Sequence, residues 1–163
     1  MEDRRVLAID AGTRNFAYCV VDPVTWREPV VWYKEDLWTK GGKPSKEQVI
    51  EITHAWCRRN KALVDSCDLV VLEQQLRTTF IVQNAVIHAL FFDKVTSVSP
   101  MTVGSFFHLP KTREHKKAAT VALCQRNATM AAEVEKLDDL ADAWMMAVWG
   151  LIKTNGLSIK QLL

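Results

Sequence analysis

Hydrophobic positions in the first third of the chain form short β-branched runs separated by polar turns. Val6 to Ile9 is an apolar run that ends at Asp10-Ala11-Gly12, and a second run extends from Phe16 to Val21. Two such runs separated by a tight glycine turn are typical of a β-hairpin. Pro29 to Tyr33 continues the pattern, and Lys40 to Pro44 is a strong loop signal. This region therefore predicts a meander of three strands.

Beyond this loop the apolar spacing becomes helical, with two short strands in between. Ser45 is a good N-cap for a helix from about Lys46 to Val64, and Asp68 to Glu73 indicates a buried strand. Thr78 to Asp93 is helical but apolar around most of its circumference, and Val95 to Val98 is another strand. A helix that is apolar all round must cover two surfaces. We therefore expect a sheet on one side of residues 78–93 and a partner on the other.

Two further segments are expected to be helical. They are Lys111 to Asn127, which is basic at its start, and Leu137 to Lys153, which is amphipathic. The order of elements predicts an α/β domain with a mixed central sheet of about five strands flanked by helices. The chain has 163 residues and shows no linker or repeat, so we expect one domain over residues 1–163.

Composition and net charge exclude few function classes. The chain is 48% hydrophobic and 25% charged, and its 21 basic and 19 acidic residues nearly balance, so a partner must be inferred from how charge is distributed. The four cysteines lack C-x-x-C spacing and indicate reduced thiols in a cytoplasmic-type reducing compartment. Asp10 interrupts the first apolar run, and no run reaches the roughly 20 residues that span a bilayer. We expect neither a signal peptide nor a membrane segment.

Four carboxylates occupy positions where catalytic sites are commonly built. Asp10 and Glu73 end apolar strands, while Asp139 and Asp142 are three apart on a predicted helix and project from one face. Clustered carboxylates repel unless they are protonated, paired with cations or neutralised by a divalent metal. Their oxygens suit Mg²⁺ or Mn²⁺, and two such ions about 4 Å apart can hydrolyse a phosphodiester. Each acid alone fits a turn or a solvated face, as Asp138 does, but the four together favour a metal site.

Basic and aromatic residues suggest a nucleic-acid partner. Lys111 to Asn127 carries five basic residues against the single acid Glu114, as contact with a phosphate backbone requires, although a solvated helix face is the simpler alternative. Further basic candidates are Lys40, Lys43, Arg58, Arg59, Lys61 and Arg77. Among the six tryptophans we expect Trp144 and Trp149 in the core. For Trp26, Trp32, Trp38 and Trp56, burial is a better explanation than stacking on bases.

Three motifs together resemble one family. They are Leu7-Ala8-Ile9-Asp10-Ala11-Gly12-Thr13-Arg14-Asn15, Val71-Leu72-Glu73-Gln74 and Asp139-Leu140-Ala141-Asp142-Ala143. In this order they resemble the RuvC-type Holliday-junction resolvases of the ribonuclease H-like superfamily, in the poxvirus and large-DNA-virus branch. The resemblance covers roughly residues 5–150. It implies a ribonuclease H-like fold and a metal-dependent endonuclease that cuts four-way DNA junctions by paired symmetric nicks.

The resemblance also implies roles for individual residues. Asp10, Glu73, Asp139 and Asp142 match the metal-binding carboxylates, with two Mg²⁺ or Mn²⁺ ions per site and Asp10 as the bridging ligand. Either Lys116 or Lys117 matches the basic position near the scissile phosphate, and Gln74 is a support residue. Residues 26–42 match nothing in the family pattern. If the protein is viral, it works where the virus replicates its DNA in the host cell.

Symmetry makes a homodimer the expected assembly, with helix 78–93 as its interface. Two sites related by a two-fold axis would match a junction whose scissile strands are also related by symmetry. The alternative is a helix buried in a larger monomeric core. Phe106-Phe107, between the last strand and the basic helix, is a candidate for contacting the junction centre.

Other function classes fit less well. An actin-like or sugar-kinase ATPase shares the Asp-x-Gly-Thr motif at Asp10 but needs two copies of the hairpin and a glycine-rich adenosine site. A non-catalytic nucleic-acid-binding relative has no reason to keep all four carboxylates. A ribonuclease H-like nuclease that acts on RNA–DNA hybrids would share them, and this is the main alternative.

Overall fold

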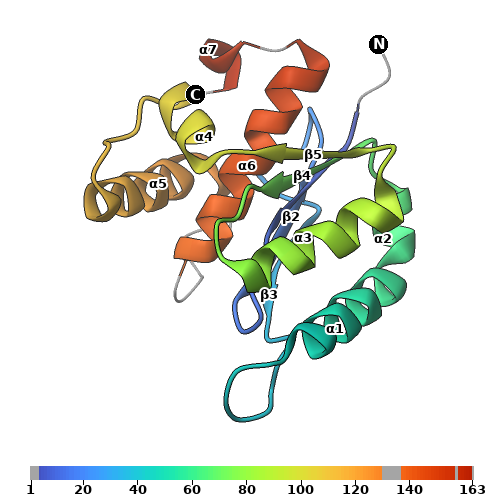
Figure 1. The fold of residues 1–163 in the computed structure, drawn as a ribbon. Helices are drawn as coiled ribbons and strands as arrows, with labels where there is room; N and C mark the ends of the chain where they lie inside the picture. The colour runs from blue at the N-terminus through green and yellow to red at the C-terminus, as the bar shows by residue number, and fades with distance from the viewer. Residues whose placement is uncertain (1–3, 130–136, 157, 163) are drawn as a thin grey trace.

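The computed structural model describes residues 4–129, 137–156 and 158–162, built around a mixed five-stranded sheet (Figure 1). The strands are β1 (Val6–Asp10), β2 (Phe16–Val21), β3 (Val31–Glu35), β4 (Leu69–Glu73) and β5 (Val95–Val98). Their spatial order is β3-β2-β1-β4-β5. The meander β1-β2-β3 is antiparallel, and β4 and β5 add in parallel on the other side of β1. The expected mixed sheet is confirmed.

Helices cover both faces of this sheet (Figure 1). On one face lie α1 (Lys46–Arg59), α2 (Lys61–Asp65) and α3 (Thr78–Phe91). On the other lie α4 (Pro100–Phe106), α5 (Arg113–Asn127) and α6 (Asp138–Asn155), and the short α7 (Ile159–Leu162) follows. Because side chains alternate along a strand, β1 supplies Val6 and Ala8 to the α6 side and Leu7 and Ile9 to the α1 side. The two cores thus share the central strands.

Helix α6 lies directly on the sheet. A Cβ atom at Gly150 would be 2.8 Å from Val71 Cγ2 and 2.9 Å from Val6 Cγ1, so the absence of a side chain permits this close approach. Gly150 packs toward the amino ends of β1 and β4, whereas Asp139 and Asp142 at the other end of α6 lie near Asp10, the last residue of β1.

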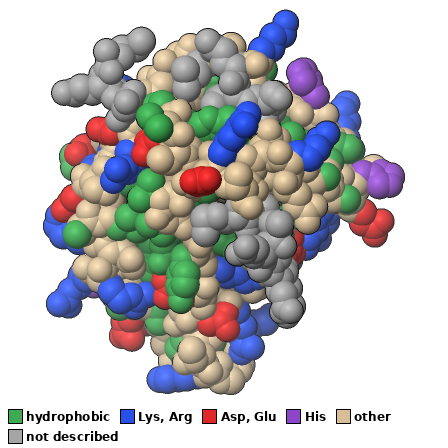
Figure 2. Space-filling model, turned by 180° about the vertical axis from the view of Figure 1, so that it is seen from behind, with side chains coloured by type: hydrophobic (Ala, Val, Ile, Leu, Met, Phe, Trp, Pro, Cys, Tyr) green, Lys and Arg blue, Asp and Glu red, His purple; other side chains and the backbone are tan. Residues whose placement is uncertain are grey.

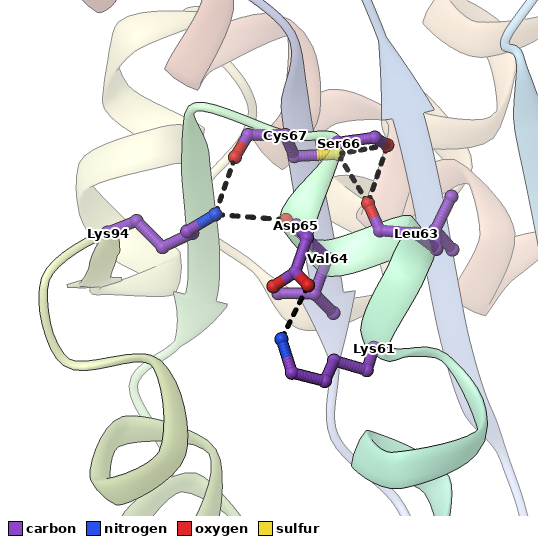
Figure 3. Close-up of polar contacts among 7 residues, drawn as sticks. All are labelled: Lys61, Leu63, Val64, Asp65, Ser66, Cys67 and Lys94. Carbon is purple, nitrogen blue, oxygen red and sulfur yellow. Dashed lines mark hydrogen bonds and ion pairs between the residues drawn. The ribbon is translucent and has the colours of Figure 1, made fainter.

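The helices differ from the sequence prediction in two main places, and the short α7 was also not predicted. The helix expected from Lys46 to Val64 ends at Arg59 and resumes at Lys61. At Asn60, between them, the backbone leaves the helical region and the side-chain Nδ2 donates to Trp56 O at 3.0 Å. The second piece, α2, ends where Lys94 Nζ donates to Val64 O and Cys67 O, at 3.2 and 3.1 Å (Figure 3).

The second difference is α4, which the sequence prediction missed. Its signal was Ser99-Pro100, because Ser99 Oγ accepts from Met101 N and proline is favoured in the first turn of a helix. Strand β3 also begins two residues later than predicted, at Val31 instead of Pro29.

The aromatic and cysteine side chains are mainly structural. Trp26, Trp38, Trp56 and Trp144 are buried, and Trp32 and Trp149 are half-buried, which fits burial better than base stacking. All four cysteines are free and buried. Within the described part of the chain, no helix has the length and apolar character needed to cross a membrane.

Candidate active site

Two of the predicted carboxylates lie side by side at the carboxyl ends of neighbouring parallel strands. The register pairs Ile9 of β1 with Leu72 of β4, which places Asp10 beside Glu73. Asp10 is half-buried, and its carboxyl group lies close to that of Glu73. Burial, followed by the charges of Glu73, Asp142 and Asp139, raises the pKa of Asp10 well above its ordinary value. The charges of all three other predicted site residues therefore act on the carboxyl group of Asp10.

The other two carboxylates come from the first turns of α6. Burial and the charge of Glu73 raise the pKa of Asp142 to about 7, and Asp139 adds to this effect. Lys116 and Lys117 oppose the rise because their positive charges favour the ionised carboxylate. The structure thus brings all four sequence-predicted carboxylates into one electrostatically coupled site.

Lysines surround this site in three different roles. Lys34 of β3, which the sequence analysis did not single out, pairs its Nζ with Asp139 Oδ2 at 2.6 Å. Lys116 Nζ donates to Pro100 O at 2.9 Å, and its side chain passes over Gly104, where a Cβ would lie 3.2 Å from Lys116 Cε. Lys117 instead pairs with Asp138.

Asp138 is paired with Lys117 and is not one of the four clustered carboxylates. Partial burial disfavours ionised Asp138, but the hydrogen bond and charge of Lys117 outweigh it and lower the pKa of Asp138. The same hydrogen bond raises the pKa of Lys117. Asp138 is therefore a paired surface residue, as the sequence indicated.

The donor chemistry of the site suits a hard divalent cation. Four carboxylates supply only oxygen ligands, which favours Mg²⁺ or Mn²⁺ over zinc, and both Asp10 and Asp142 are half-buried. Across residues 4–129, 137–156 and 158–162, however, no three acidic, histidine or cysteine side chains are arranged to hold a metal ion as they stand. Gln75 Nε2 donates to Glu73 Oε2 at 3.0 Å, and Lys34 pairs with Asp139. The role of these carboxylates as metal ligands stays a prediction.

A cleft of about 920 Å³ opens beside these residues. Asp10, Glu73 and Asp139 lie in its wall, as does Gln74, the predicted support residue. Its basic lining residues are Arg14, Lys43, Arg77 and Arg113. Arg14 is the one that the sequence analysis missed as a basic candidate. It donates to Lys40 O and Gly42 O, each at 3.2 Å, and so ties the loop before α1 to the β1–β2 turn.

Several other basic candidates are paired elsewhere. Arg59 pairs with Glu35 at 2.6 Å and Lys61 with Asp65 at 2.5 Å, and neither lines the cleft. On the face shown in Figure 2, Lys and Arg side chains are interspersed with acidic ones and do not gather in one patch. The basic residues next to the carboxylates are those that line the cleft.

Phe106 and Phe107 pack against the protein itself. Phe107 is 7% exposed and lies in the core beneath α6, and Lys153 Nζ lies 5.4 Å from the ring centroid of half-buried Phe106. The candidate contact between this pair and a junction centre gains no support from these positions.

The sheet order and the position of α6 are those of the ribonuclease H-like fold seen in RuvC-type resolvases. Fowlpox virus resolvase in complex with Holliday junction DNA superposes with a TM-score of 0.65 and 17% identity over 92% of this chain and 98% of that one. Thermus thermophilus RuvC with a Holliday junction substrate gives 0.61 and 16%, over 93% and 96%. The yeast mitochondrial Holliday junction resolvase Ydc2 gives 0.63 and 17%, over 99% and 87%. At these identities the likeness establishes the fold.

Family membership comes from the sequence itself. Residues 4–154 match the family described as Poxvirus A22 protein, and the chain belongs to this family. No curated protein sequence matches the chain. The resemblance that the three motifs indicated is therefore confirmed for the family and for the fold.

Proposed function

We propose that this protein is a metal-dependent endonuclease that resolves four-way DNA junctions by paired symmetric nicks. The observation that carries the proposal is that the charges of Glu73, Asp139 and Asp142 all act on half-buried Asp10, beside a cleft lined with basic residues. Two proteins of this fold, fowlpox virus resolvase and Thermus thermophilus RuvC, were solved with Holliday junction DNA, which supports the choice of substrate.

The four carboxylates Asp10, Glu73, Asp139 and Asp142 would hold the Mg²⁺ or Mn²⁺ ions, two per site. Such ions activate water for attack and neutralise the leaving oxygen of a phosphodiester. Crowded, buried carboxylates favour this binding because a cation relieves their mutual repulsion. The hydrogen bond from Gln75 to Glu73 and the Lys34–Asp139 ion pair are the contacts that would have to break.

Lys116 is the better candidate for the basic group near the scissile phosphate. Its Nζ is held by Pro100 O on the wall of the cleft, and among the lysines its charge has the larger effect on the pKa of Asp142. Lys117 is the second candidate and is engaged by Asp138. Arg14, Lys43, Arg77 and Arg113 would contact DNA phosphates along the cleft.

The outer surface of α3 is apolar and exposed, which supports a homodimer with this helix at its interface. Ile87 and Phe91 face the core, whereas Ile81 and Phe92 are 49% and 79% exposed. Ala85 and Ala89 are exposed between them and complete an apolar stripe at helical spacing. Pairing these stripes about a two-fold axis would give two active sites for two scissile strands.

The main competing function is cleavage of RNA–DNA hybrids or other branched DNA by the same carboxylates, and a non-catalytic nucleic-acid-binding relative is a further alternative. The proposed place of action is the site of viral DNA replication in the host cell, in a reducing compartment that suits four free thiols.

The function is tested by cleavage of a labelled four-way junction in Mg²⁺ or Mn²⁺ by the wild-type protein and by Asp10→Asn. We expect the wild type to cut and Asp10→Asn to bind the junction in a gel shift without cutting it. Asp138→Asn is the matched control, because Asp138 is paired with Lys117 outside the cluster, and it should still cut. Cleavage by Asp10→Asn at the wild-type rate would contradict the proposal.

A further inference from the structure

We infer that Gln83 and Asn84, two neighbouring residues of α3, are positioning residues that set the distance between the Asp10 and Glu73 strand ends. Gln83 Nε2 donates to Gly12 O at 3.3 Å, in the turn that follows Asp10. Asn84 Nδ2 donates to the backbone carbonyl of Glu73 itself, at 2.7 Å. Both side chains are almost completely buried, with 0% and 8% of their surface exposed.

The β1–β4 pairing brings the two strand ends together but stops just short of the carboxylates themselves. Its residue pairs run from Val6 and Leu69 to Ile9 and Leu72, so they end one residue before the two carboxylates. Asp10 pairs outward with Ala17 of β2, and Glu73 pairs outward with Val98 of β5. The amides of Gln83 and Asn84 therefore connect the ends of β1 and β4 through α3, just beyond the last residue pair of the two strands.

The turn that receives Gln83 is itself tightly constrained. A Cβ at Gly12 would be 2.6 Å from Asn15 O, so the backbone folds back on itself there. A donor that fixes Gly12 O consequently fixes the direction in which the chain leaves Asp10. This makes the hydrogen bond from Gln83 a constraint on the carboxylate two residues earlier.

Packing alone does not account for amides at these two positions. Gln83 Oε1 and Asn84 Oδ1 are buried without a hydrogen-bond partner among the described residues. A buried unsatisfied acceptor is unfavourable, and an apolar side chain of similar size would avoid it. What an amide adds is the N–H donor, and both donors are directed at the backbone of the carboxylate-bearing strand ends.

This inference rests on the proposed function, because it assumes that the carboxylates hold divalent metal. If the amides set their geometry, removing both donors should weaken metal binding while leaving the fold in place. Outer partners that orient metal ligands typically change metal affinity or activity by about 10–100-fold when they are mutated. A purely structural role would instead change thermal stability and leave metal affinity unaltered.

The test is the double variant Gln83→Met with Asn84→Leu, compared with Asn60→Leu as the control. Asn60 is also a half-buried amide that donates to a backbone carbonyl, at 3.0 Å, but it lies between α1 and α2. Mn²⁺ binding to the protein without DNA is measured by titration calorimetry, together with the melting temperature and junction cleavage across a Mn²⁺ series. We expect the double variant to need about 10-fold more Mn²⁺ for both binding and cleavage. The control should keep wild-type values.

Unchanged Mn²⁺ binding and cleavage in a folded double variant would overturn the inference, as would an equal loss in Asn60→Leu. If the double variant does not fold, Asn84→Asp keeps the shape of the side chain, removes the donor and should show the same direction of change. Failure of the proposed function has a different signature, since the wild-type protein would then cut no junction. Mn²⁺ binding still tests the amides in that case, and a wild type that neither binds Mn²⁺ nor cuts would overturn both.

Discussion

Lys34 Nζ lies 2.6 Å from Asp139 Oδ2, so a strand at the edge of the sheet reaches the first turn of α6. Trp32, two residues earlier and on the same face of β3, donates from its Nε1 to Leu140 O at 2.8 Å. Together these contacts anchor the start of α6 from one side, while Lys117 holds Asp138. The charge of Lys34 also partly neutralises the carboxylate cluster.

Replacing Lys34 by methionine should strengthen divalent metal binding. Lys34 and a metal ion would compete for the same oxygen of Asp139, and the pair is partly exposed, so its contribution is about 1 kcal/mol or less. We therefore expect Lys34→Met to bind Mn²⁺ up to about 5-fold more tightly, because 1.4 kcal/mol corresponds to a factor of ten. Titration calorimetry measures this affinity. Weaker Mn²⁺ binding would mean that Lys34 helps to form the metal site.

The raised pKa of Asp142 predicts a specific pH dependence of stability. Its pKa rises from 3.8 to about 7 on folding, so the folded state binds the proton more tightly between these values. The contribution of Asp142 to stability is therefore fully present below about pH 4 and is lost as the pH rises through 7. Relative to Asp142→Asn, the wild type should lose at most about 4 kcal/mol over this range, since one pKa unit corresponds to 1.36 kcal/mol.

Urea unfolding of the metal-free proteins at about pH 4.5, 6 and 8 measures how this difference declines across the upper part of the window. Mg²⁺ should then stabilise the wild type more at pH 8 than at pH 6, because the ligands must be deprotonated. Parallel pH profiles for the wild type and Asp142→Asn would contradict the assignment of a buried, protonatable Asp142.

Gly150→Ala should destabilise the fold even though alanine favours helices. The new Cβ would be within 3 Å of stiff valine methyl groups from β4 and β1, so α6 must move away from the sheet. Overpacking of this kind destabilises by about 1–3 kcal/mol, which exceeds the gain in helix propensity of about 1 kcal/mol. Gly41→Ala is the control, because nothing lies within 4 Å of its added Cβ. Equal unfolding free energies for the two variants would show that α6 can accept a Cβ at position 150 without moving away from the sheet.

Charges on the outer stripe of α3 should separate the proposed dimer. We expect the double variant Ile81→Asp with Phe92→Asp to sediment as a monomer, because buried unpaired carboxylates oppose association. Val24→Asp is the control, since Val24 is also 79% exposed but lies between β2 and β3. Analytical ultracentrifugation distinguishes the two states. A monomeric wild type, or a double variant that stays dimeric, would remove α3 from the interface.

The site was predictable from sequence where a carboxylate coincides with a clear structural signal. Asp10 and Glu73 each end a run of mainly buried apolar residues, and parallel strand ends meet at one edge of the sheet. Asp139 and Asp142 share a helix face by their spacing. These local patterns specify position without any knowledge of the tertiary structure.

Residues that act through long-range contacts were not predictable in this way. Lys34 is 105 positions from Asp139 in the chain, and nothing around it distinguishes it from any lysine on an edge strand. Gln83 reaches Gly12 across 71 positions. Two adjacent amides inside an apolar helix were a signal that some polar group must face them, but its identity depends on the fold.

Substrate choice is the central claim, and one cleavage experiment tests it most directly. A labelled four-way junction, a linear duplex and an RNA–DNA hybrid of matched sequence are incubated with wild-type protein, with and without Mg²⁺ or Mn²⁺. The four-carboxylate site and the proposed two-fold dimer predict paired nicks at symmetric positions on the junction, sealed by ligase and formed only with metal. Preferential cutting of the hybrid, or tight junction binding without any cutting, would contradict the assignment of this protein as a junction resolvase.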